Sequence, residues 1–197
     1  MTLKLNGSSS GYTAIDAPAA AGSNTLVLPT TNGSAGQVLQ TDGSGNLSWA
    51  SMAGRILQVV TATTTTEASS TGAYTDSNLT KAITLASTSS KVLILINQAV
   101  GFAISANTVT GLGLKLLRDS TTLRVDPVNP SMWKAKVGTG SGSEVSMGFH
   151  HTFVDIDSPN TAGSVTYKTQ IGQEASGTAY AQNDSRQSWI VLAEIGG

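Results

Sequence analysis

Residues 91–96 read KVLILI, five aliphatic side chains in a row after a lysine. A short, continuous apolar run of this kind is typical of a strand in the middle of a β-sandwich, with both of its faces covered. Residues 189–193, WIVLA, have the same character, whereas residues 165–171, VTYKTQI, alternate as a half-buried strand does. We therefore expect these segments to be central strands of the fold.

More strand candidates lie at short spacing around these segments, at residues 55–61, 80–85, 112–117, 122–125 and 145–156. Residues 118–120, Arg-Asp-Ser, fit a hairpin turn between two of them. No amphipathic helical pattern separates the candidates. About eight to ten strands arranged in this way predict an all-β fold, a β-sandwich of the jelly-roll type.

The composition excludes several classes of function. Only 12% of the residues are charged and the net charge is −1, so the chain lacks the basic field that would attract nucleic acid or an anionic membrane. The absence of cysteine excludes disulfides and thiolate metal sites. The N-terminus lacks the apolar core of a signal peptide, and the longest apolar run is interrupted by Asn97 and Gln98. We expect no nucleic-acid partner and no membrane insertion.

The first fifty residues differ from the rest, because they contain only three charged side chains and alternate short apolar tracts with turns. Asn32-Gly33 and Asp42-Gly43 are tight-turn signals. Each tract is too short to bury a core alone, so we predict an extended β arm at residues 1–51, before a sandwich head at residues 52–197. The alternative is a flexible Gly/Ser linker. The residues expected to anchor or trimerise the arm are Leu26, Leu28, Val38, Leu39, Leu47 and Trp49.

Residues 11–26, GYTAIDAPAAAGSNTL, and 36–49, GQVLQTDGSGNLSW, resemble a module common in structural proteins of tailed bacteriophages. In those proteins it often precedes the C-terminal head of tail fibres and other virion appendages. The later segments MGFH (147–150), VTYK (165–168) and 190–197 are similar to distal domains attached to that module. The resemblance implies a homotrimeric virion protein with a thin, intertwined neck and a globular β head.

The resemblance also implies a location and partners. The module begins near Met1 instead of following a long shaft, which favours a short tail fibre, a tip or a capsid-mounted head fibre. The expected partners are further copies of the chain, other virion proteins of the capsid or tail, and a glycan or protein of the host surface. We therefore expect a virion fibre or decoration protein that adheres to the host, with a capsid-stabilising cement protein as the alternative.

No catalytic, metal or cofactor site can be assigned from the sequence. Residues 7–11 match the pattern G-x-S-x-G, but a nucleophile elbow needs a strand before the serine and a helix after it. Neither flank fits, and we expect no enzyme. His150 and His151 are the only histidines, and as strand neighbours they point to opposite faces and cannot bind one ion together. His151, Asp155 and Asp157 share a face, where hydrogen bonding within the protein is the simpler interpretation.

Contact with a ligand is expected at two segments predicted to be loops. Trp133 and Lys134 end the segment 128–134, and Tyr180 lies in the segment 178–184. An exposed aromatic ring beside polar groups suits stacking on a carbohydrate or a contact with a protein. A core position for Trp133 is an equally good interpretation.

Overall fold

The computed structural model describes residues 3–51, 54–104, 109–126, 133–136, 145–175 and 177–197. The chain divides into two compact units, Met1–Met52 and Ala53–Gly197, which are treated separately below. None of the described residues forms a helix long and apolar enough to cross a membrane.

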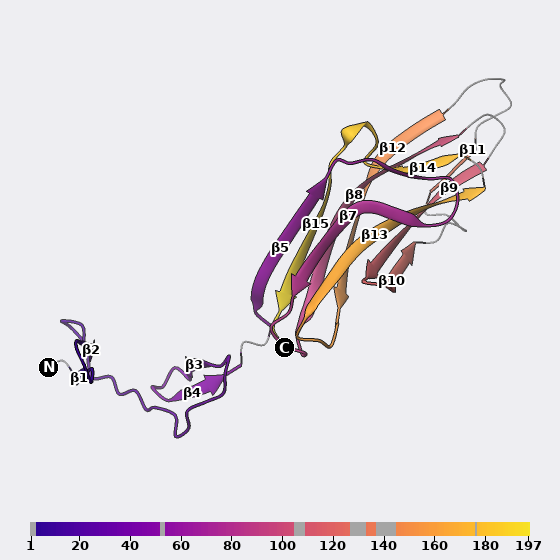
Figure 1. Ribbon diagram of the computed structural model, residues 1–197. Coiled ribbons are helices and arrows are strands. Elements are labelled where there is room, and N and C mark those ends of the chain that lie inside the picture. Colours follow the sequence, from indigo (N-terminus) through magenta and orange to yellow (C-terminus); the bar gives the residue numbers. More distant parts are fainter. Residues whose placement is uncertain (1–2, 52–53, 105–108, 127–132, 137–144, 176) are drawn as a thin grey trace. The chain divides into compact units, whose positions relative to one another are not determined.

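The larger unit consists of two antiparallel sheets of long strands (Figure 1). One sheet is formed by β10 (Thr121–Asp126), β9 (Val109–Arg118), β13 (Ser164–Ala175), β7 (Thr75–Thr84) and β11 (Trp133–Lys136). The other is formed by β5 (Ile56–Thr64), β15 (Ser188–Ile195), β8 (Lys91–Ile104), β12 (Val145–Asp157), β14 (Thr178–Ala181) and β6 (Ala68–Ser70). A short 3-10 helix, η1 (Asn183–Ser185), precedes β15.

The strand pairing is that of a jelly roll. The first main strand pairs with the last, β5 with β15, and the pairs β7–β13, β8–β12 and β9–β10 follow inward along the chain. The chain is therefore one long antiparallel ribbon that is wrapped into two sheets, in the orders β5-β15-β8-β12 and β7-β13-β9-β10. The predicted all-β, jelly-roll-like sandwich is confirmed.

Alternate residues of the main strands enter the core between the sheets, as the period of two requires. Its largest fully buried side chains include Ile94, Ile96, Leu112, Leu114, Leu116, Tyr167, Ile190 and Leu192. An ion pair also joins the sheets, because Nη1 of Arg118 donates to Asp157 at 2.7 Å and the Tyr167 hydroxyl donates to the same carboxylate at 2.8 Å. Burial raises the pKa of the Tyr167 hydroxyl well above its ordinary value, which keeps it a donor.

Each of the eight predicted strand segments lies within a strand, to within one residue at its ends, and three expectations are corrected. Trp133 and Lys134 are the first residues of β11, not part of a loop, because the backbone of this segment pairs with β9. Tyr180 lies in β14, not in a loop, because it pairs with both β8 and β6. In the predicted segment of β8, residues 91–96, the outward side chains of Leu93 and Leu95 are only half-buried, so this part of the strand is not covered on both faces. Residues 128–132 lie outside the described part of the chain.

The smaller unit contains two hairpins, β1 (Leu3–Asn6) with β2 (Tyr12–Ile15), and β3 (Val38–Thr41) with β4 (Leu47–Ala50). A parallel bridge between Val27 and Asn46 adds the preceding segment to the second hairpin. The first hairpin has four exposed residues on each strand. This unit therefore forms β-structure without building a core of its own.

Candidate interaction surface

The loop that joins β3 to β4 is closed by one carboxylate. Asp42 accepts hydrogen bonds from the Asn46 side chain at 2.7 Å, from the Ser44 N–H at 2.8 Å and from the Asn46 N–H at 3.1 Å. These hydrogen bonds, above all that of the Asn46 side chain, lower the pKa of Asp42. Gly43 and Gly45 have φ values of 84° and 94°, in the left-handed region that favours glycine. The sequence DGSGN therefore specifies a rigid turn.

A preceding segment packs against this turn. The Val27 N–H donates to the Gly45 carbonyl at 2.9 Å, and the Leu47 N–H donates to the Val27 carbonyl at 2.8 Å. A Cβ on Gly45 would overlap the carbonyl oxygen of Thr25, so the close approach of the two backbones requires glycine. The consequence is that the neighbours of Val27, Leu26 and Leu28, are held out from the hairpin.

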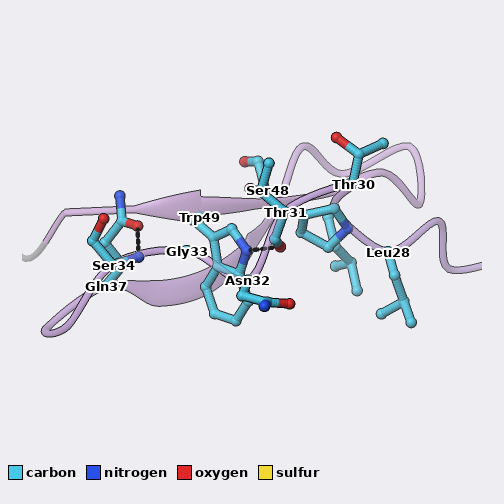
Figure 2. Close-up of a pocket in the computed structure, with 11 residues that line it drawn as sticks. Leu28, Thr30, Thr31, Asn32, Gly33, Ser34, Gln37, Ser48 and Trp49 are labelled. Atoms are coloured by element: carbon cyan, nitrogen blue, oxygen red, sulfur yellow. Dashed lines mark hydrogen bonds between the residues drawn. The ribbon is translucent and has the colours of Figure 1, made fainter.

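Trp49 fastens the remaining loop to the hairpin, as Figure 2 shows. Its indole N–H donates to the Thr31 carbonyl at 2.7 Å, and its ring lies against Gly33, which has a φ of 73°. The Ser34 N–H donates to the Gln37 side chain at 2.6 Å, closing a turn between the loop and β3. The loop and β4 line an open hollow beside the indole, and the contacts of Trp49 with Thr31 and Gly33 give this side chain a structural role.

The six predicted arm residues have two different environments. Val38, Leu47 and Trp49 are half-buried within the second hairpin, where Leu39 faces Trp49 across the strands. Leu26 and Leu28 are 66% and 70% exposed, and Leu39 is exposed as well. Three of the six residues therefore pack within the second hairpin, and the other three form exposed apolar surface.

Sequence reasoning missed the first hairpin, although its signal is present. Leu3 and Leu5 alternate with polar residues, and the turn-forming segment 7–11 separates them from β2. Leu3 pairs with Ile15 and Leu5 pairs with Thr13, so three large apolar side chains share one face, where Ile15 is 66% exposed. An isolated two-stranded hairpin is marginally stable in water. The first hairpin therefore exposes an apolar face to solvent.

The candidate ligand contacts lie on strands of two different sheets. Trp133 and Lys134 lie on β11, at the edge of the sheet that contains β9, and the described part of the chain does not include their side-chain environment. Tyr180 lies in the other sheet, half-buried, with Gly101 and Ser69 as its partners across the strands. Their role in ligand contact stays a prediction.

The serine and histidine patterns do not form reactive sites. Ser9 lies in the turn of the first hairpin, which joins two strands and contains no elbow. His150 and His151 point to opposite faces of β12, with His150 exposed and His151 half-buried against Phe153. Asp157 is engaged by Arg118. Among the described residues, no group of three or more His, Asp or Glu side chains could hold a metal ion.

No protein-family model matches the sequence, and no curated protein matches it. A structure of infectious bursal disease virus, Gt strain, is similar over 74% of this chain and 34% of that one, with 14% identity and a TM-score of 0.35. The VP2 subviral particle of that virus is similar over 77% of this chain and 40% of that one, with 14% identity and a TM-score of 0.30. Latent PorU from Porphyromonas gingivalis is similar over 73% of this chain and 13% of that one, with 10% identity and a TM-score of 0.32. The chain spans well under half of the length of each, and likeness of this extent has no bearing on function.

Proposed function

We propose that this chain is a structural protein of a bacteriophage virion, a homotrimeric fibre or decoration protein that is exposed on the particle and adheres to the host surface. The proposal rests on the exposed apolar side chains of the N-terminal unit. This unit has two preformed hairpins and a fixed turn, and yet it leaves large apolar side chains such as Ile15, Leu26 and Leu28 in water.

The energetics of this unit favour assembly. Burying one large aliphatic side chain contributes about 1.5–3 kcal/mol, so a partner that covers several of them stabilises the arm substantially. Ordering each backbone residue costs about 1–2 kcal/mol, which a unit without a core cannot offset alone. Copies of the same arm are the simplest partner, because each brings unpaired strand edges and a matching apolar face. A capsid or tail protein is the second partner that we propose.

The virion assignment is supported by the resemblance of residues 11–26 and 36–49 to the module of tailed-phage structural proteins, together with the roles that the structure assigns to its residues. Asp42, Gly45, Asn46 and Trp49 each hold the turn or the loop of the module. The head adds a jelly roll, a scaffold used in viral capsid and lectin domains. We propose no catalytic activity and no cofactor for the chain.

Adhesion is assigned to the head, with Trp133, Lys134 and Tyr180 as proposed contacts with a host glycan or protein. The alternative is a capsid decoration protein that mainly stabilises the phage head; in that case the arm's apolar surface is buried on the capsid. A tail fibre and a capsid protein differ in copy number and in place on the particle. Immunogold labelling of intact particles separates them, since a tail fibre labels one vertex and a cement protein labels the whole shell.

The assembly itself is tested by the mass of the full-length chain in light scattering. We expect a particle three times the 20.1 kDa of the chain. A monomer at all concentrations would overturn the proposal. Adhesion is tested on arrays of bacterial envelope glycans with the intact oligomer: Lys134→Ala and Tyr180→Ala should lower retention, while Tyr12→Ala in the arm should not.

A further inference from the structure

The outer face of the sheet that contains β8 is apolar over its central strands. At one level of this sheet, the aligned outward residues on β5, β15, β8 and β12 are Val59, Ala193, Leu93 and Ile156. At the next level, they are Thr61, Val191, Leu95 and Val154. The alternate residues of these strands point into the core, which fixes the outward direction of these two levels.

This apolar face, defined by these two levels and the level of Trp189, is open to solvent in the single chain. Ile156 is 59% exposed and Val154 is 53% exposed, whereas Leu93 and Leu95 are half-buried by their neighbours. At the third level, the aligned residues on β5, β15, β8 and β12 are Thr63, Trp189, Asn97 and Thr152. The twelve positions of the three levels carry no charged side chain.

The outer face of the opposite sheet carries charged and polar side chains, which water solvates. Lys168 forms an ion pair with Asp76 at 2.8 Å, and Gln170 donates to the same carboxylate at 2.8 Å. The Lys115 ammonium lies 4.0 Å from the ring centre of Tyr74. Among the described residues, the two outer faces of the sandwich therefore differ in charge, because the three levels on the face with β8 carry none.

The chain covers one end of its apolar sheet by itself. Beyond the third level, Gly148 on β12 faces Gly101 on β8, and the guanidinium of Arg186 occupies the space that a Cβ on Gly148 would need. Arg186 is held there by a hydrogen bond from Nε to the Asn183 carbonyl at 3.2 Å. Arg186 and the adjacent η1 segment therefore cover this end of the sheet, and the exposed apolar face lies beyond them.

We propose that this apolar face packs on the head of a second copy of the chain, a contact between heads within the oligomer. The inference rests on the proposed homo-oligomeric assembly and assigns it a second interface. Each outward position of a sheet covers about 30 Å², because strands lie ~4.8 Å apart and same-face residues ~6.7 Å apart, so the twelve positions cover roughly 400 Å². A stable interface needs about 800 Å² from each partner, which makes this face half of one and leaves the rest to the arm.

The absence of charge favours a copy of the same chain over a different partner. In a closed oligomer, a patch that lies on the symmetry axis meets its own copies, and a charged residue there would face the same charge. Thr61 and Thr63 at the margin are uncharged and exposed, and their hydroxyls can both donate to and accept from the same groups of a neighbour.

The contact is tested by photo-crosslinking of the full-length chain with benzoylphenylalanine in place of Thr61. The matched control carries it in place of Ala82, which is also exposed in a strand but belongs to the opposite sheet. We expect an inter-chain product at position 61 whose peptides map to β5, β8, β12 or β15 of a second copy. A product within one chain, a product with residues 1–51, or no product above the control would each overturn the proposal.

A charge in the face provides a second, independent measurement. Val154→Lys should lower the yield of that product by about tenfold, since burying the charge costs more than ~1.4 kcal/mol, while Ala82→Lys should leave it unchanged. Light scattering on the same samples separates the two proposals. An oligomer without the crosslink removes the contact between heads alone, whereas a monomer removes the assembly and this contact together.

Discussion

The indole ring of Trp49 lies directly on the backbone of Gly33, sixteen residues earlier in the chain. A Cβ on Gly33 would be 2.6 Å from Cδ2 of the indole, closer than two such atoms can approach. The loop that contains Thr31 and Gly33 is thereby held against β4, because the indole N–H also donates a hydrogen bond to the Thr31 carbonyl. Much of the shape of the N-terminal module depends on this contact.

Gly33→Ala should therefore displace the Trp49 ring. The new Cβ overlaps with the indole, and a residue with a Cβ is strained at a positive φ. Together these two effects should lower the stability of the folded N-terminal unit by about 1–3 kcal/mol. Trp49 fluorescence should shift to the red and the oligomer should dissociate at higher protein concentration. Gly36→Ala is the control, because Gly36 also has a positive φ and a Cβ there has open space. Equal effects of the two variants would contradict the role of the clamp.

The first hairpin offers a test of the arm as an assembly surface. Ile15→Asp places a carboxylate on the face that Leu3 and Leu5 share and should weaken association at least tenfold, about 1.4 kcal/mol. Ala14→Asp is the control, because residue 14 lies on the other face of the hairpin, opposite Lys4. Dilution measured by light scattering gives the association constants. The thermal unfolding of the head, followed separately, should be the same in both variants, and equal association constants would refute the prediction.

The main strands could be predicted from the sequence because each has its own apolar pattern. The short strands could not: β14 reads TAYA, and β6 contains only three residues, so both owe their existence to neighbours that pair with them. Trp133 and Lys134 were placed in a loop for the same reason, since the partner of β11 lies on β9, far away in sequence. Local pattern predicts a strand, and tertiary pairing decides the marginal cases.

The half-exposed outer face of β8 shows a different limit. Five consecutive aliphatic residues predict that both faces of a strand are buried, yet the pattern does not say which chain buries the second face. Leu93 and Leu95 point outward over the bare apolar face. The N-terminal residues have the same property, because Leu26 and Leu28 were correctly identified as apolar but cannot be covered within their unit. In both places, the predicted burial is not met within the unit that contains these residues, and we propose that assembly supplies it.

A buried polar chain connects the two sheets and should contribute to stability. Thr169 on β13 donates to the Gln98 side chain on β8 at 2.8 Å and contacts the Ser77 hydroxyl at 2.5 Å, and all three residues are fully buried. Thr169→Val keeps the shape and removes the hydroxyl, which leaves buried polar groups unpaired and should cost about 1–3 kcal/mol. Urea unfolding at one fixed protein concentration measures the change. Thr166→Val, on the outer face of the same strand, should change the unfolding free energy by less than about 0.5 kcal/mol.

Glu194 should make the head sensitive to acid. Its carboxylate is fully buried near the C-terminal end of β15 and accepts hydrogen bonds from the Gln58 side chain at 2.6 Å and from the Ala86 N–H at 2.8 Å. Burial alone would raise the pKa of Glu194, but these hydrogen bonds, above all that of Gln58, lower it below the ordinary value of 4.5. The folded state therefore binds this proton less readily than the unfolded state does.

The direction of the pH dependence follows from that difference. The stability contributed by the carboxylate is fully present above the pKa of the unfolded state and is lost as the pH falls through the lower pKa of the folded state. Urea unfolding should therefore show a free energy that declines as the pH falls below the ordinary pKa of 4.5. Glu194→Gln should flatten this decline and cost about 1–3 kcal/mol at pH 7, because the charge-assisted hydrogen bonds are lost there. Glu67→Gln, at an exposed carboxylate between β5 and β6, should leave the profile unchanged. A Glu194→Gln profile as steep as that of the unmodified chain would show that this carboxylate does not set the acid limit of the head.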